Sequence, residues 1–145
     1  MTIAVQKRLV LLTMEAIDNS TLEKLEEVIL LNQGLWGYPD RAEENMNKAE
    51  EILQTLLLAD PDNTIVLTSL GAVLCDRGLY DEALHHLKSA EKLGSGDRHL
   101  FENIGIVLMN KPAGKKAEAL KYFEKAARLR TNALSITAWF DPQGH

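Results

Sequence analysis

The sequence predicts an all-α protein built from antiparallel helical hairpins, on three observations. Apolar residues recur at steps of three and four along most of the chain, which is the spacing of one helix face, and no stretch alternates like a half-buried strand. Clusters of Gly, Pro, Asn and Asp form short links between these stretches, as between neighbouring antiparallel helices. A pattern centred on Gly71 returns 34 residues later at Gly105, which indicates an internal repeat.

The first three helices are predicted at 3–17, 20–36 and 41–58. Asp18 and Asn19 end the first helix. Ser20 and Glu23 form a capping-box pattern that begins the second, because each side chain accepts a backbone N–H that has no partner inside the helix. The segment 34–40 is predicted as a loop, since it holds two glycines and Pro39, which lacks a backbone donor.

The later helices are predicted at 64–76, 80–93, 98–110 and 116–129. Turn-forming residues separate them: Asp60-Pro61-Asp62-Asn63, Gly78, Gly94-Ser95-Gly96-Asp97 and Lys111-Pro112-Ala113-Gly114. Asn132 to Phe140 is expected to form a short final helix that packs apolar side chains on the last hairpin.

Each copy of the repeat places a small residue between large ones. Leu67-x-x-Leu70-Gly71-x-x-Leu74 matches Phe101-x-x-Ile104-Gly105-x-x-Leu108, 34 residues later. On the following helices, Ala119-x-x-x-Phe123-x-x-Ala126 repeats Ala83-x-x-x-Leu87-x-x-Ala90 after 36 residues. Small residues let helices approach closely, while large residues fill the space between neighbouring hairpins.

This pattern resembles the tetratricopeptide repeat (TPR) family. The resemblance implies a right-handed α-solenoid of TPR-like antiparallel helix hairpins with flanking N- and C-terminal capping helices. We interpret 1–145 as one domain, with an N-terminal capping helix and a degenerate helix in 1–40, the TPR core in 41–131 and a C-terminal cap or tail in 132–145. The match is weak before about residue 45, and Ser95 and Thr131 stand where a closing proline equivalent to Pro61 would recur.

In the family, the first helices of successive hairpins line a concave groove that receives a peptide. The resemblance assigns this peptide-binding groove to Ile65, Thr68, Ser69, Ala72, Cys75, His99, Glu102, Asn103, Ile106 and Met109. Such a groove is nearly neutral and partly apolar, which suits aliphatic side chains of a peptide, with Asn103, Thr68 and Ser69 bonding its backbone. A family subgroup grips the C-terminal carboxylates of Hsp70 and Hsp90 chaperones with Lys, Arg and Asn side chains. Asn103 alone has that character here, so this clamp is not expected.

Composition argues against several classes of function. A net charge of −5 and a pI near 5.4 disfavour nucleic acid, which binds mainly through Lys and Arg. The one cysteine, Cys75, cannot form an internal disulfide. No apolar run reaches the ~18 residues that span a bilayer, so a cytoplasmic location is expected. His85 and His86 point about 100° apart on a helix and cannot chelate one metal together, so we predict no metal or other cofactor. No catalytic arrangement has suitable spacing, and an enzyme is not expected.

The leading hypothesis is a non-enzymatic adaptor or scaffold that binds a segment of another protein. Two alternatives remain open. One is a small bacterial TPR-type secretion chaperone that dimerises through its N-terminal helix, 3–17, because that helix carries a broad apolar face. The other is a self-associating structural subunit.

Overall fold

The computed structural model describes residues 17–37, 39–112 and 114–139, so most of the expected helix 3–17 lies outside the described residues. Within these ranges the chain is helical and has no β-strand, which confirms the all-α class. The elements are α2 (Asn19–Gly37), the 3₁₀-helix η1 (Pro39–Arg41), α3 (Ala42–Ala59), α4 (Thr64–Asp76), α5 (Tyr80–Lys92), α6 (Arg98–Asn110) and α7 (Lys116–Ala126).

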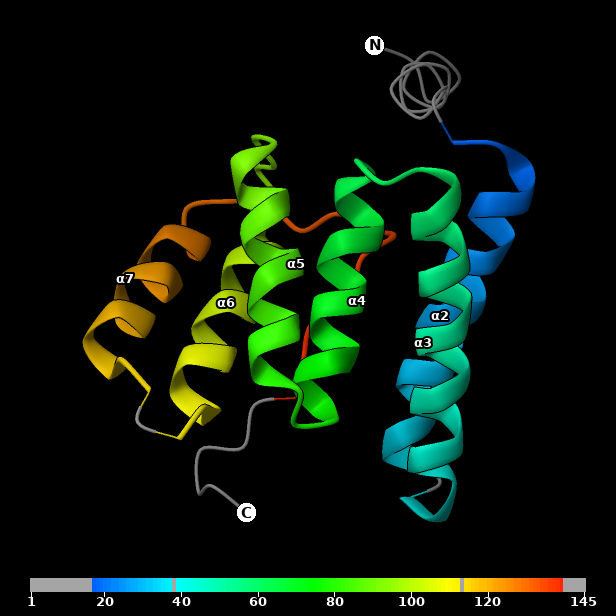
Figure 1. The fold of residues 1–145 in the computed structure, drawn as a ribbon, viewed down its shortest axis with the longest axis horizontal. Coiled ribbons are helices and arrows are strands. Elements are labelled where there is room, and N and C mark those ends of the chain that lie inside the picture. Colours follow the sequence, from blue (N-terminus) through cyan, green and yellow to red (C-terminus); the bar gives the residue numbers. More distant parts are fainter. Residues whose placement is uncertain (1–16, 38, 113, 140–145) are drawn as a thin grey trace, which may run out of the picture.

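The helices pair as three successive hairpins, which Figure 1 shows side by side: α2 with α3, α4 with α5, and α6 with α7. Neighbouring hairpins are joined by contacts of α3 with α4 and of α5 with α6. The first helices of the last two hairpins, α4 and α6, also contact each other directly. This is the stacked arrangement of a helical repeat, in which each hairpin buries its apolar side against the next.

The small and large residues of the repeat interlock as the pattern predicts. A Cβ atom added to Gly71 in α4 would lie 2.4 Å from Leu87 in α5, and one added to Gly105 in α6 would lie 2.8 Å from the Phe123 ring in α7. These distances leave no room for a side chain. The two glycines therefore allow the helices of the second and third hairpins to pack closely.

The start of α2 differs from the prediction. Asp18 accepts a hydrogen bond from the Thr21 backbone N–H at 2.7 Å, so α2 begins at Asn19 with Asp18 as its cap. The expected Ser20–Glu23 capping box is therefore wrong. The Thr21 N–H also lowers the pKa of the Asp18 carboxyl below its usual value, because it stabilises the ionised form.

The predicted loop at 34–40 is also partly wrong, because α2 continues to Gly37. Gly34 permits this by close packing on α3, since a Cβ there would lie 2.9 Å from the Asn45 side-chain nitrogen. Asn45 donates a hydrogen bond to the Leu31 carbonyl at 3.4 Å, which ties the end of α2 to α3. At the other end of the chain, α7 stops at Ala126 rather than at the predicted 129.

The expected final helix at 132–140 is wrong over its described part. Residues 130–139 contain no helix and, apart from a turn at 133–134, run as irregular extended chain. Thr131, Ile136 and Thr137 are β-branched and favour extended backbone over helix. Side chains elsewhere in the fold bond the N–H groups of Ile136, Ala138 and Trp139, which a helix would have paired internally.

Candidate functional site

All ten residues of the predicted groove lie on α4 and α6, and the surface that these two helices form is called here the α4/α6 face. Six of the ten are buried: Thr68, Ser69, Ala72, Cys75, Asn103 and Ile106. The other four, Ile65, His99, Glu102 and Met109, are half-buried. The face is therefore mostly covered rather than open to solvent.

The cover is the chain's own C-terminal segment, residues 131–139. Figure 1 shows this segment, orange to red, leaving α7 and passing behind α5 to reach α4. The segment buries Leu134, Ser135, Ile136 and Ala138, whereas Ala133 and Trp139 are exposed and Thr137 is half-buried. From 136 to 139, buried residues alternate with more exposed ones, which is the pattern of an extended chain with one side against a protein surface.

Polar side chains of the α4/α6 face bond the backbone of this segment. Ser69 Oγ accepts from the Ile136 N–H at 3.2 Å. The Asn103 amide makes two bonds, since its Nδ2 donates to the Ile136 carbonyl at 3.0 Å and its Oδ1 accepts from the Ala138 N–H at 2.7 Å. One buried amide thus replaces the neighbouring strand that an extended backbone would otherwise need.

A second set of bonds holds the beginning of the segment at the start of α6. Asp97 Oδ1 caps α6 by accepting from the His99 N–H and also accepts from the Asn132 N–H, both at 3.0 Å. Asp97 Oδ2 accepts from the Ser135 hydroxyl at 2.6 Å, which leaves His99 Nδ1, 2.8 Å away, to donate to the same Ser135 oxygen. The hydroxyl of Ser135 is therefore held as both donor and acceptor.

Two predicted residues take other roles. Glu102 forms an ion pair with Arg98 in the same helix, with the Arg98 Nε and Glu102 Oε1 atoms 2.7 Å apart. Thr68 contributes its carbonyl oxygen, which accepts from Asn103 Nδ2 at 3.2 Å. The Thr68 hydroxyl is buried, and among the described residues it has no hydrogen-bond partner. Of the three residues expected to bond a peptide backbone, Ser69 and Asn103 bond the segment and Thr68 does not.

The sequence prediction missed Asp76 and Asp97. Asp76, the last residue of α4, accepts a hydrogen bond from the Trp139 N–H through Oδ1 at 2.7 Å. It follows Ala72 by four residues and so shares its helix face, which is the signal that could have identified it. Asp97 was recognised as a turn residue before α6, but nothing local indicates that its carboxylate also binds Asn132 and Ser135.

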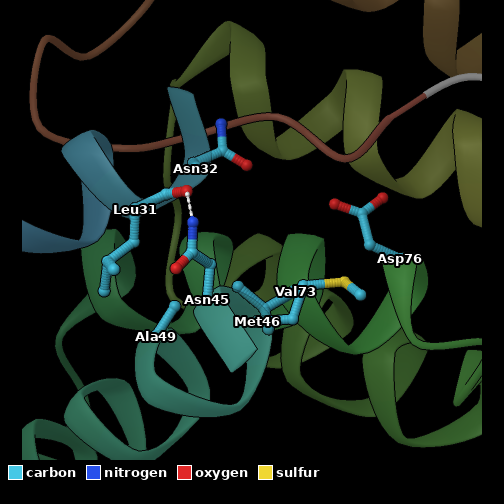
Figure 2. A pocket seen from close by; sticks show the side chains of 7 residues that line it. All are labelled: Leu31, Asn32, Asn45, Met46, Ala49, Val73 and Asp76. Carbon is cyan, nitrogen blue, oxygen red and sulfur yellow. Dashed lines mark hydrogen bonds between the residues drawn. The ribbon is translucent and has the colours of Figure 1, made fainter. Parts of the chain in front are cut away.

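Figure 2 shows Asp76 at one side of a small pocket between α2, α3 and α4, with its carboxylate directed away from the helices toward the passing chain. Leu31, Asn32 and Asn45 lie on the opposite side, and the Met46 side chain extends from α3 toward Asp76. Burial raises the pKa of Asp76 to about 6, although the Trp139 N–H bond acts in the other direction. Burial also raises the pKa of the neighbouring Cys75 thiol to about 12, so this cysteine stays protonated and unreactive at neutral pH.

We expect Asp76→Asn to increase the free energy of unfolding at pH 7 by about 1–3 kcal/mol, because it removes a half-buried charge. Folded Asp76 binds its proton more tightly than unfolded Asp76. The free-energy cost of holding the ionised carboxylate in the folded wild type therefore decreases as the pH falls through 6 toward 4, and the difference between the two proteins decreases with it. Urea unfolding of both proteins between pH 4 and 8 measures this difference. A difference that stays constant over the range would contradict the prediction, and Asp62→Asn, at an exposed position, is the control.

We looked for two further features, a metal site and a membrane-spanning helix, in the part of the chain that the structure describes. There, no three His, Cys, Asp or Glu side chains gather closely enough to hold a metal ion. Among the described helices, none combines the length and apolar character required to cross a membrane.

Comparison with known proteins gives two relatives from Pseudomonas aeruginosa. The chain is 34% identical over 90 residues to a protein named type IV pilus assembly protein PilF, a match that covers 61% of this chain and 35% of the relative. It is 29% identical over 133 residues to a TPR repeat-containing protein, covering 82% of this chain and 22% of the relative. The chain thus spans about a third or less of the relatives it matches. No model of a protein family matches the chain. The two relatives, together with the stacked hairpins, confirm the resemblance to the TPR family.

Proposed function

We propose that this relative of the tetratricopeptide repeat proteins is a non-enzymatic adaptor whose α4/α6 face holds an extended segment of a partner protein. The observation that supports the proposal is the chain's own segment 131–139, which lies on this face with its backbone bonded to Ser69, Asn103 and Asp76. A surface that accommodates one extended segment in this way has the chemistry to accommodate another.

The bonding pattern supports a protein partner rather than a small molecule. Ser69, Asn103 and Asp76 bond peptide N–H and carbonyl groups, which every protein segment carries. Ala72 and Ile106 add buried apolar surface on the same face, which favours apolar side chains over charged ones. Peptide recognition generally divides in this way, with affinity from main-chain hydrogen bonds and selectivity from the sites that take alternate side chains.

One relative suggests a context for the partner. It is named for type IV pilus assembly, and it supports, as a second candidate, an adaptor role in assembling a bacterial surface structure. The secretion chaperone that dimerises through helix 3–17 depends on residues outside the described ranges and stays a prediction, as do the self-associating subunit and the cytoplasmic location.

Photo-crosslinking tests the adaptor proposal. A photoreactive residue at Ile65 or Met109, half-buried on α4 and α6, is expected to capture a second protein in extract of the source organism. The same residue at Leu58 of α3 or Leu120 of α7, both exposed, is the control and should capture that protein weakly or not at all. Capture from the control positions alone would mean that the partner binds elsewhere and would refute the proposed face.

A further inference from the structure

We infer that the partner segment has a definite pattern, aliphatic–Ser–aliphatic–any residue–small, and that it binds in exchange with the chain's own residues 131–139. This inference rests on the proposed function and specifies its ligand. The pattern is that of residues 134–138, Leu-Ser-Ile-Thr-Ala, as the α4/α6 face holds them.

The aliphatic and small positions follow from burial. Leu134, Ile136 and Ala138 are 9%, 4% and 6% exposed and belong to the same apolar core as the helices. Thr137 between them is half-buried, so that position tolerates other residues. The Ala138 side chain is buried and its backbone N–H is fixed 2.7 Å from Asn103 Oδ1, so a larger residue would have to displace the atoms packed around it.

The serine position follows from hydrogen bonding. The Ser135 hydroxyl donates to the Asp97 carboxylate at 2.6 Å and accepts from His99 at 2.8 Å. An aliphatic residue there would remove the donor that Asp97 Oδ2 has from Ser135, and an acidic residue would place two negative groups in contact. The face therefore selects for a hydroxyl and against an acid at this position.

Exchange is favoured by a buried hydroxyl that the chain's own segment leaves without a hydrogen bond. The Thr68 side chain is fully buried, and its hydroxyl has no hydrogen-bond partner among the described residues. The carbonyl oxygens of Thr68 and Ile136 both accept from Asn103 Nδ2, so the residue that carries this hydroxyl adjoins the amide that holds the segment. A partner segment that supplies a polar group there gains a bond that the internal segment lacks.

The test uses a fluorescent peptide with the sequence of residues 131–139 and the full chain carrying Ile136→Asp, which loosens the internal segment and leaves Ser69 and Asn103 intact. The peptide is expected to bind this variant about tenfold or more tightly than the wild type, because the internal competitor keeps most wild-type sites occupied. Peptides with Asp in place of Ser135 or Ile136 should bind the variant about tenfold or more weakly than the parent peptide.

Absence of peptide binding to Ile136→Asp, and to Leu134→Asp as a second loosened variant, would overturn the inference, provided that circular dichroism shows both to be helical. Equal binding of the Asp-substituted peptides would overturn it too. A wild-type dimer that Ile136→Asp dissociates would instead assign the face to the segment of a second copy. Crosslinking from Met109 without peptide binding would leave the adaptor function intact and reject only this pattern. Peptide binding without crosslinking would show that the face can hold this pattern but would count against a partner protein that binds there.

Discussion

Replacing Phe101 by alanine is expected to lower the free energy of unfolding by about 3–5 kcal/mol. Phe101 is 1% exposed in α6 and occupies the position of Leu67 one repeat earlier. Its ring stacks on Tyr122 of α7 with centroids 6.3 Å apart, and Lys125 Nζ lies 4.3 Å from the Phe101 centroid. Loss of the ring therefore removes contacts within the third hairpin and leaves a cavity that rigid helices cannot close.

Urea unfolding monitored by circular dichroism measures the effect. Phe101→Leu restores the residue found in the preceding repeat and should cost about 1 kcal/mol, because it keeps most of the apolar volume. Leu58→Ala, at a position 85% exposed on α3, is the control and should change stability by less than about 0.5 kcal/mol. A cost for Phe101→Ala close to that of the control would show that α6 and α7 do not depend on this ring.

The helical part of the fold could be predicted because its signals are local and repeated. The predicted bounds 64–76 and 98–110 match α4 and α6 at both ends. Their starts are local signals, since Asn63 and Asp97 accept backbone N–H groups of the first turn through side-chain oxygens. The repeat itself identified the close pairs, because Gly71 and Gly105 recur in one setting and each faces a large residue of the next helix. Propensity, capping and packing agree in these hairpins.

The C-terminal segment could not be predicted in the same way because its signals conflict. Leu134 and Ala138 are four residues apart, as on a helix face, while Leu134, Ile136 and Ala138 alternate, as in a strand. Over so short a stretch, neither period distinguishes a helix from an extended chain. The extended form is determined by Asp97, Ser69 and Asn103, which lie more than thirty residues away in sequence and pair its backbone. Tertiary contacts, rather than local sequence, therefore determine the conformation of this segment.

The residues of the α4/α6 face could therefore be predicted from the sequence, but the segment that they bond could not. The resemblance to the repeat family assigns Ser69 and Asn103 to one surface, and their hydroxyl and amide groups indicate that it bonds a peptide backbone. That these groups meet the chain's own Ile136 and Ala138 is visible in the structure alone. Binding of a partner there remains a prediction, and its cost includes displacement of the segment already present.

Asn103→Ala is expected to release the C-terminal segment while the helices stay folded. Asn103 is fully buried and bonds Thr68, Ile136 and Ala138, so its loss leaves buried backbone groups unpaired unless the segment leaves the face. We expect docking to weaken by about 2–3 kcal/mol, which reduces hydrogen-exchange protection of the Ile136 and Ala138 amides about 30- to 150-fold. Amides inside α4 and α6 should keep most of their protection.

The matched control is Asn47→Ala, an exposed asparagine in the body of α3, which should leave both sets of amides unchanged. Uniform loss of protection in α4, α6 and the segment after Asn103→Ala would contradict the prediction, because it would make Asn103 a requirement of the whole fold. Selective loss in the segment would instead mean that the hairpins are stable without their cover. The α4/α6 face would then be free to exchange one extended chain for another, as an adaptor of this kind requires.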